Sequence, residues 1–236
     1  MRIYQSVREA IFETERELLE MGIDFQSYSY QDKIVNENDD FMTKELQSYG
    51  FQIIAPDPEE AITVSKFILG DKIEPWIRAE FEERVGGLPL NPGKSWELRK
   101  NIWEQFLESS GKFSYTYSQL MFSQIKPIIN ELREHPHTRQ AIIELHNNIY
   151  DLPKLGGKRR IPCSMHYQFM IRNGGMDCIY VMRSSSFYEH TTNDVTLAIM
   201  LQNYIREQVD PALKQGVFTF HCGSLHAFKK QLIGIF

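Results

Sequence analysis

The chain has 236 residues, of which 42% are hydrophobic and 24% charged, and its formal net charge is −5. This length and composition can bury one sizeable core, so a single domain over residues 1–236 is expected. The acidic balance argues against a general binder of nucleic-acid backbones, because such proteins usually carry a basic excess on one face. A small anionic ligand needs only two or three placed arginines and is compatible with this charge.

The first 22 residues are charged throughout, and no window approaches the roughly 18 to 20 apolar residues that a membrane-spanning helix requires. We therefore expect a cytoplasmic protein without membrane contact. The three cysteines, Cys163, Cys178 and Cys222, have no paired short spacing. Neither a disulfide framework nor a metal site is indicated, and free thiols are expected.

The first half of the chain predicts mainly helices. Apolar residues recur near a helical period over 2–21, and Gly22 follows as a stop. Asp57 and Pro58 are typical of the N-cap and first position of a helix. Helices are expected over 2–21, 41–49 (ended by Gly50), 57–69, 72–84, 96–107 and 117–133, the last with a kink at Pro127.

After His135 the pattern changes to strands. Four segments have the β-rich composition of strands, and "RNGGM" between the second and third is typical of a hairpin turn. The expected strands cover 140–145, 165–172, 176–183 and 217–222, with a helix over 193–208 before the last. A helical first half therefore leads into a strand-rich second half.

Two interpretations of Cys163 follow from its surroundings. Arg159 and Arg160 lie just upstream, and cationic neighbours favour the reactive thiolate. Most free cysteines, however, pack as small hydrophobic residues in strands. The residues near Cys163 leave both interpretations open.

Cys163 also begins an ordered set of residues with informative spacing. Arg183 and Ser184 follow 20 and 21 residues later, Asp194 lies 11 residues after Arg183, and "GSLHAF" supplies His226. From about 138 to 228 this pattern resembles the thymidylate synthase family, in which a Pro-Cys dipeptide carries the nucleophile and a strand-end Arg-Ser pair binds the nucleotide phosphate. The resemblance implies an α/β (α+β) fold, with a mixed sheet, flanking helices and shortened N- and C-terminal segments.

Weaker matches lie upstream. "TKELQSY" resembles the family helix with the catalytic glutamate, which implies that role for Glu45. "NIWEQF" implies that Trp103 borders the folate, and "SYTYSQ" implies that Tyr117 is an active-site tyrosine. Taken singly, Glu45 is also typical of a solvated helix face and Trp103 of a core.

"HPHTRQAIIEL" resembles the segment whose arginines enter the neighbouring subunit's phosphate site. This implies a homodimer in which Arg139 crosses the interface. Gln140 stands where the family usually has a second arginine, so Arg159 or Arg160 is a candidate replacement.

Asp194 stands where thymidylate synthases have an asparagine that reads uracil. Together with Asn193 before it and "GSLH" downstream, it resembles the deoxycytidylate hydroxymethylase branch of the family. A protonated carboxyl can donate to cytosine N3 and accept from its exocyclic amine, and a carboxylate can bind cytosine protonated at N3. The alternative is that Asp194 only caps the following helix.

The resemblance implies a covalent mechanism on a cytidine monophosphate, dCMP or CMP. C5 of a pyrimidine is a poor nucleophile until a thiolate, here Cys163, adds at C6. Methylenetetrahydrofolate would supply the carbon, and water positioned by Glu45 would give a 5-hydroxymethyl group, whereas hydride would give a methyl. His226 would bind the sugar hydroxyl.

Two residues depart from the family pattern. Ser186 stands where an aspartate usually contacts the pterin, and Phe228 replaces a sugar-binding tyrosine. Ser186 puts the use of folate in question, and Phe228 puts the identity of the sugar, deoxyribose or ribose, in question. Two alternatives therefore stand beside the (deoxy)cytidylate hydroxymethylase: a related pyrimidine nucleotide enzyme that makes a methyl product or uses no folate, and a nucleotide-binding protein without turnover.

Overall fold

The computed structural model describes residues 1–26, 29–30, 33–34, 39–155 and 160–232. In these ranges the main sheet has seven strands in the order β1-β5-β9-β8-β7-β6, with β2 pairing to β5, and β3 and β4 form a separate pair. β1/β5 and β8/β9 are parallel, and the other pairs in the main sheet are antiparallel. No helix in the described ranges is long and apolar enough to cross a membrane.

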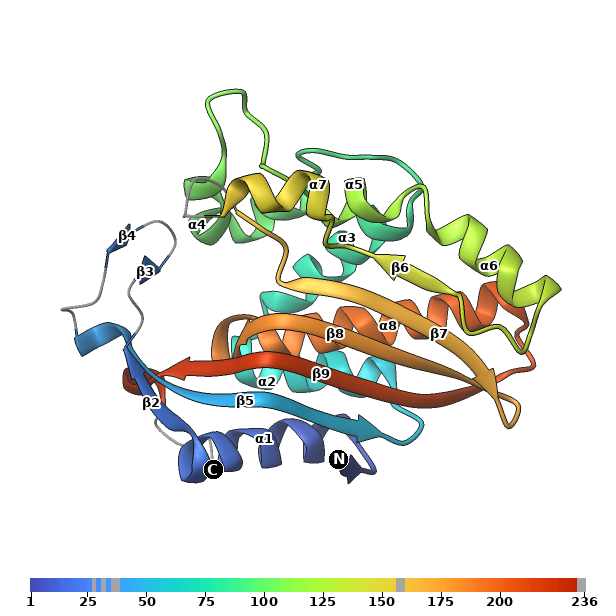
Figure 1. The fold of residues 1–236 in the computed structure, drawn as a ribbon, viewed down its shortest axis with the longest axis horizontal. Helices are drawn as coiled ribbons and strands as arrows, with labels where there is room; N and C mark the ends of the chain where they lie inside the picture. The colour runs from blue at the N-terminus through green and yellow to red at the C-terminus, as the bar shows by residue number, and fades with distance from the viewer. Residues whose placement is uncertain (27–28, 31–32, 35–38, 156–159, 233–236) are drawn as a thin grey trace.

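The strands are β1 Arg2–Tyr4, β2 Ile23–Gln26, β3 Ser29–Tyr30, β4 Lys33–Ile34, β5 Met42–Ile53, β6 Ile142–Glu144, β7 Ser164–Arg172, β8 Gly175–Ser186 and β9 Lys214–Phe228. The helices are α1 Val7–Met21, α2 Pro58–Leu69, α3 Ile73–Val85, α4 Lys100–Trp103, α5 Tyr117–Met121, α6 Ile125–Glu134, α7 Asn148–Asp151 and α8 Thr192–Val209. In Figure 1, α2, α3 and α8 lie behind the sheet, and α1 runs along its β5 edge.

Local sequence signals explain several of these elements. The Asp57 side chain accepts from the backbone N–H of Glu59 and caps α2, with Pro58 at its first position. Asn173 and Gly174 both have positive φ and close the predicted hairpin between β7 and β8. The predictions of α1, α2, α3, α8 and the four C-terminal strands are confirmed, with shifted ends.

The helix predicted over 41–49 is wrong, because this segment belongs to β5. Its apolar residues continue as Tyr49, Phe51 and Ile53, which alternate toward the core at the period of a strand. Gly50 is not a helix stop: a Cβ there would lie 3.0 Å from the backbone oxygen of Phe220 on β9. The first half of the chain thus contributes the second strand of the main sheet.

Two other predicted helices are interrupted. The segment predicted as one helix over 96–107 forms three short turns, at Ser95–Arg99, Lys100–Trp103 and Glu104–Phe106. The helix predicted over 117–133 breaks between α5 and α6, before Pro127. Pro127 lies in the first turn of α6, where its missing N–H costs no helical hydrogen bond.

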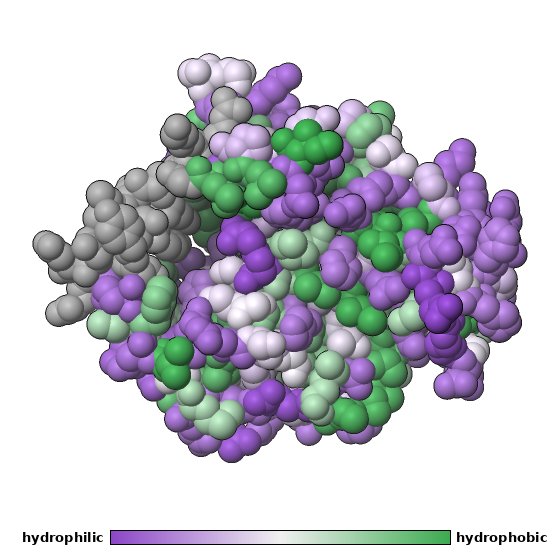
Figure 2. Space-filling view, in the orientation of Figure 1, coloured by the Kyte–Doolittle hydropathy of each residue, from purple (hydrophilic) through white to green (hydrophobic). Residues whose placement is uncertain are grey.

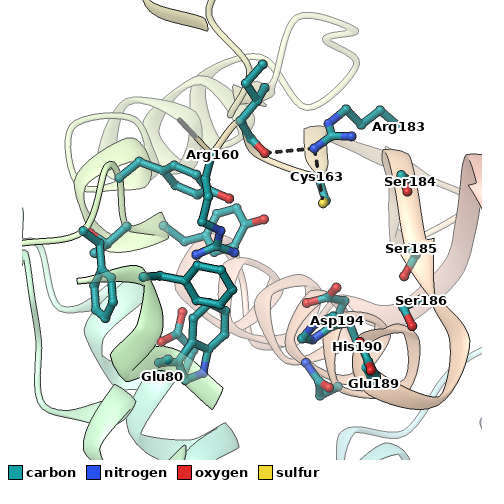
Figure 3. A pocket seen from close by; sticks show the side chains of 18 of the residues that line it. Glu80, Arg160, Cys163, Arg183, Ser184, Ser185, Ser186, Glu189, His190 and Asp194 are labelled. Atoms are coloured by element: carbon teal, nitrogen blue, oxygen red, sulfur yellow. Dashed lines mark hydrogen bonds between the residues drawn. The ribbon is translucent and has the colours of Figure 1, made fainter. Parts of the chain in front are cut away.

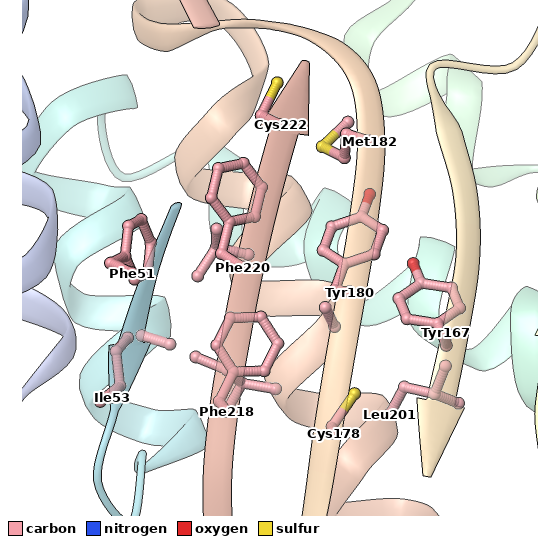
Figure 4. Packing of buried hydrophobic residues seen from close by; sticks show 14 of the residues in the cluster. Phe51, Ile53, Tyr167, Cys178, Tyr180, Met182, Leu201, Phe218, Phe220 and Cys222 are labelled. Atoms are coloured by element: carbon pink, nitrogen blue, oxygen red, sulfur yellow. The ribbon is translucent and has the colours of Figure 1, made fainter. Parts of the chain in front are cut away.

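The core lies between the sheet and the helices behind it. Alternate side chains of β5, β8 and β9, such as Phe51, Tyr180 and Phe220, are fully buried on this face (Figure 4). Cys178 and Cys222 belong to the same layer, and burial raises the pKa of Cys222 to about 12. These two thiols therefore pack as hydrophobic residues.

The other sheet face is turned toward the viewer in Figure 1. Figure 2 shows hydrophilic and hydrophobic side chains interspersed over it. Polar pairs bridge its strands; for example, Gln52 Nε2 on β5 donates to Thr219 Oγ1 on β9 at 3.3 Å.

Candidate active site

A pocket of about 710 Å³ opens where the end of β8 meets the start of α8. We call its two sides the strand wall (residues 45, 160–163, 183–186, 189–194, 224 and 226) and the helix wall (76–84, 93–96 and 103–118). Eleven of the twelve predicted site residues line it: Glu45, Trp103, Tyr117, Arg160, Cys163, Arg183, Ser184, Ser186, Asn193, Asp194 and His226. Arg139 does not.

The parallel register of β8 and β9 brings the strand wall together. Ser184 pairs with Ser224, and Ser186 pairs with His226. On the far side of β9, Glu45 of β5 pairs with His226. Residues separated by up to 181 positions in the chain therefore meet at one edge of the sheet.

Cys163 is half-buried just before β7 and points into the pocket, toward Arg183 (Figure 3). Arg183 donates from Nε to the backbone oxygen of Pro162 and from Nη2 to that of Ile161, each at 3.0 Å, and its Nη2 lies 3.6 Å from Cys163 Sγ. Burial raises the pKa of the Cys163 thiol, although Arg183 opposes this. The thiolate is thus a minor form at neutral pH, and it would form next to a fixed cation.

Asp194 faces Cys163 from the first turn of α8 (Figure 3). Burial raises the pKa of its carboxyl to about 7, although Arg84 and Arg99 lower it. The N-cap position of α8 belongs to Thr191, so Asp194 is not the cap residue. A carboxyl that can be protonated near neutral pH therefore stands close to the Cys163 thiol.

Asn193 is buried at the base of the same turn. In the amide orientation that gives both the nitrogen and the oxygen a partner, Nδ2 donates to the backbone oxygens of Glu189 and His190, each at 3.2 Å. Oδ1 then accepts from the backbone N–H of Asp194. Asn193 thus fixes the turn that presents Asp194.

Glu45 lies in the pocket, but not on the helix predicted to carry it. Ser224 Oγ donates to its Oε1, and Gln47 Nε2 donates to its Oε2 at 3.0 Å. Both oxygens therefore have partners. Its neighbour His226 is mostly uncharged, because burial lowers the pKa of that imidazole.

Two glutamates of α3 that were not predicted, Glu80 and Glu83, also line this pocket. Glu80 lies on the helix wall, across the pocket from Asp194 (Figure 3). Four acidic residues of α3, Glu74, Glu80, Glu82 and Glu83, look alike in the sequence. An i,i+4 arginine does not distinguish Glu80 in the sequence, because Glu74 has the same spacing to Arg78; burial of Arg84 in the fold is what marks Glu80.

Arg84 is 4% exposed and contacts two other side chains of the helix wall. Its Nε donates to Glu80 Oε1 at 2.8 Å, and its guanidinium carbon lies 4.3 Å from the centre of the Tyr117 ring. The Tyr117 hydroxyl accepts from Ser164 Oγ at 3.1 Å, next to Cys163. Tyr117 is therefore held from both sides.

Trp103 belongs to an aromatic group with Phe106 and Tyr115. The guanidinium carbon of Arg160 lies 5.0, 4.3 and 5.6 Å from these three ring centres. Arg160 is therefore on the side of the aromatic rings, away from Arg183 (Figure 3). Arg159, the other candidate replacement for Gln140, lies outside the described residues.

Three buried polar atoms of the pocket residues have no hydrogen-bond partner among the described residues: Ser186 Oγ, Trp103 Nε1 and Trp76 Nε1. Ser186 is 6% exposed. Such atoms are costly to bury unpaired, which is typical of positions completed by a ligand. Phe228 is buried and packs edge-on against Phe41, 5.6 Å between centres, so it offers the pocket no hydroxyl.

Arg139 is exposed outside the pocket, before β6. Its backbone oxygen accepts from Gln168 Nε2 on β7 at 2.9 Å. Within this chain, Arg139 does not contribute to the site.

Comparison with known proteins gives consistent matches. The family model described as "Thymidylate synthase" matches residues 92–235, more than half of the chain. The chain is 23% identical over 136 residues to the thymidylate synthase of Clostridium beijerinckii and 28% identical over 150 residues to a provisionally named thymidylate synthase of Methanocaldococcus jannaschii. These matches cover 57% and 59% of this chain, but only 49% and 65% of the two relatives. The chain therefore spans about half to two thirds of the length of the curated relatives it matches.

Among solved structures, the thermostable thymidylate synthase A from Bacillus subtilis is similar with a TM-score of 0.63 at 13% identity. The match covers 97% of this chain and 82% of that one. It confirms the predicted fold class, a mixed sheet with flanking helices.

Proposed function

The chain belongs to the thymidylate synthase family, and from this premise we propose that it transfers a one-carbon unit from methylenetetrahydrofolate to C5 of a cytidine monophosphate, with water addition to give the 5-hydroxymethyl nucleotide. The observation that carries the cytidine assignment is the Asp194 carboxyl, which faces Cys163 and has a pKa of about 7. The enzyme is thus a (deoxy)cytidylate 5-hydroxymethyltransferase.

Cys163 is the nucleophile. Its sulfur forms a bond to C6, the C5=C6 π pair moves onto C5, and C5 becomes able to attack an electrophilic carbon. Arg183 stabilises the thiolate that starts this step. At the end of the reaction the C6–S bond breaks, and the thiolate returns.

Asp194 recognises the base. Its protonated carboxyl donates to N3 and accepts from the exocyclic amine of cytosine. A proton shared with N3 also draws electron density from C6, which assists addition of Cys163. Asn193 positions this carboxyl through the backbone of the turn.

Arg183 and Ser184 bind the phosphate, and His226 binds the sugar hydroxyl. Arg139 completes the phosphate site from a second copy of the chain. Its place beside β7 on the exposed sheet supports a homodimer that packs through this face, with Arg139 near the interface.

Residues from both walls fit the folate. Trp103 and Phe106 offer aromatic faces for a planar ring, Ser186 Oγ and Trp103 Nε1 offer unpaired polar atoms, and Arg160 offers donors for a carboxylate. When bound, methylenetetrahydrofolate would supply the carbon at the oxidation level of formaldehyde.

A carboxylate must accept a proton from the water that adds to the new carbon. Glu80 is better placed for this than Glu45, because it faces the pocket from α3 opposite Asp194. We assign to Glu80 the role of accepting the proton from the water. Glu45 has a supporting role near the sugar-binding residue His226, through its hydrogen bond with Ser224.

Tritium release from C5-labelled dCMP, CMP and dUMP tests this function, with and without methylenetetrahydrofolate and with Cys163→Ser as the control. Folate-dependent release from a cytidine nucleotide, with a product of hydroxymethyl rather than methyl mass, is expected.

Ser186 in place of an aspartate favours one alternative, an enzyme that keeps the nucleotide and Cys163 but uses no folate. Tritium release that is the same with and without methylenetetrahydrofolate would support this alternative. Nucleotide binding without release from any substrate would instead identify a binding protein.

A further inference from the structure

One hydroxyl group in the helix wall lies between two carboxylates. Ser95 Oγ is 2.9 Å from Glu80 Oε2 and 2.8 Å from Glu83 Oε2, and Ser95 is only 3% exposed. A serine hydroxyl has a single hydrogen and cannot donate fully to both oxygens. If Glu80 carries a proton, it donates to Ser95 Oγ, Ser95 donates to Glu83, and both contacts become complete hydrogen bonds.

The outer oxygens of the two carboxylates are also held. Glu80 Oε1 accepts from Arg84 Nε at 2.8 Å. Glu83 Oε1 accepts from the backbone N–H groups of Lys94 and Ser95, at 2.5 and 2.8 Å. Each carboxylate therefore has its own donors, which stabilise it as an anion when the proton is on the other carboxylate.

Gly93 permits this arrangement. A Cβ at this position would lie 2.0 Å from Glu83 Oε2 and 2.3 Å from Oε1. Only glycine lets the chain pass this close to the carboxylate and deliver Ser95 between the two glutamates. Lys94, beside Glu83, is exposed. In the series of hydrogen bonds Glu80–Ser95–Glu83, Glu83 is therefore the member near solvent.

We propose that Ser95 and Glu83 form a proton relay that serves Glu80. The proposal rests on the proposed function, in which water adds to the carbon attached to C5. The water oxygen forms the bond to the exocyclic carbon, the π pair of that carbon's double bond moves to C5, C5=C6 re-forms as the C6–S bond breaks, and the water proton moves to Glu80. Glu80 then gives a proton to Ser95 Oγ, the original Ser95 hydrogen moves to Glu83 Oε2, and Glu83 releases a proton to solvent. No electrons are exchanged, and the sequence restores Glu80 for the next turnover.

A purely structural role for Glu83 is the alternative, because its carboxylate also fixes the loop through Lys94 and Ser95. Glu83→Gln separates the two. The amide oxygen can still accept from both N–H groups, while the amide nitrogen would donate to Ser95 and cannot take up its proton. Glu82→Gln, an exposed neighbour on α3, is the matched control.

The experiment measures hydroxymethylation by the full chain in H₂O and D₂O. Glu83→Gln and Ser95→Ala should lower kcat about 10²-fold, the low end of what general acid–base catalysis contributes, with KM for the nucleotide unchanged. Ser95→Thr retains the hydroxyl and should restore most of kcat. The solvent isotope effect should be smaller in Ser95→Ala than in the unmutated protein, because fewer protons move in that variant.

An active unmutated protein whose Glu83→Gln variant keeps its kcat and isotope effect would overturn the relay and leave the proposed function intact. A loss of kcat in Ser95→Thr equal to that in Ser95→Ala, with both variants folded, would also contradict it. An unmutated protein without turnover would overturn the proposed function, and the relay with it.

Discussion

The two walls of the pocket are built in different ways. The strand wall carries the thiol, Arg183 and a row of hydroxyl groups. Backbone pairing of β8 with β9 positions the hydroxyl groups, and a backbone hydrogen bond from Arg183 N–H to the oxygen of Cys163 positions the thiol. The helix wall carries carboxylates, aromatic rings and the buried Arg84, and side-chain contacts position them.

This difference predicts how each wall responds to substitution. Changing a side chain on the strand wall leaves its backbone register in place, so chemistry should be lost without loss of the fold. On the helix wall a side chain is both a reactive group and a support for its neighbours. Substitutions there should affect catalysis and stability together.

Cys163→Ser is the largest expected effect and isolates the strand wall. Turnover should fall about 10⁴-fold or more, because a serine hydroxyl is a far weaker nucleophile toward C6. The free energy of unfolding should change by less than about 1 kcal/mol, because the two side chains are similar in size. Tritium release and urea unfolding measure the two quantities. A variant with substantial activity would remove Cys163 from the mechanism.

Glu80→Gln tests which wall supplies the carboxylate for the water. Its turnover should fall by about 10² to 10⁴, the range for loss of a general base. Glu45→Gln is the comparison on the strand wall and should lose less than about tenfold, since it retains the size and oxygen acceptor of the side chain. A larger loss of turnover in Glu45→Gln than in Glu80→Gln would show that Glu45, not Glu80, accepts the proton from the water.

Arg84→Met tests the support that the helix wall depends on. Removing a buried partner of Glu80 should destabilise the protein by about 3 kcal/mol, measured by urea unfolding. Arg78→Met is the matched control, because Arg78 pairs with Glu74 at the same spacing on α3 but is exposed; it should cost less than about 1 kcal/mol. Equal costs would show that Arg84 does not hold the wall.

Asp194→Asn should weaken recognition of the cytidine base, and its diagnostic effect is a change in pH dependence. In the unmutated protein, loss of the protonated carboxyl above a pKa of about 7 cancels the gain of Cys163 thiolate, so kcat/KM should level off near pH 7. Asparagine does not titrate, so kcat/KM of the variant should continue to rise about tenfold per pH unit. The rise should end near the pKa of Cys163, which lies above its ordinary value. A variant that also levels off near pH 7 would exclude Asp194 as the titrating group.

The strand wall was largely predictable from the sequence, because the spacings from Cys163 to Arg183 and from Arg183 to Asp194 span one hairpin and one turn. A two-residue turn at Asn173 and Gly174 fixes that register locally. Long-range pairing of β8 with β9 then brings in His226, which only the motif indicated.

The helix wall was harder to predict. The choice among the glutamates of α3 depends on which ones face Arg84 and Ser95, and only tertiary packing decides this. The prediction of a helix over 41–49 is wrong for a similar reason. Pairing with β9 overrides the helical preference of the Glu, Leu and Gln residues in this segment. The proposed role of Arg139 requires a second copy of the chain, which no pattern in one sequence can position.

Exchange of the C5 hydrogen of CMP, dCMP and dUMP with D₂O, followed by proton NMR without folate, tests the central claim most directly. Addition of a thiolate at C6 makes C5 basic enough to take up deuterium, so this signal reports the strand wall alone. The unmutated protein should exchange C5–H of a cytidine nucleotide, and Cys163→Ser should not. Equal exchange in both proteins, or none from a nucleotide that binds, would contradict the account of Cys163 as the nucleophile.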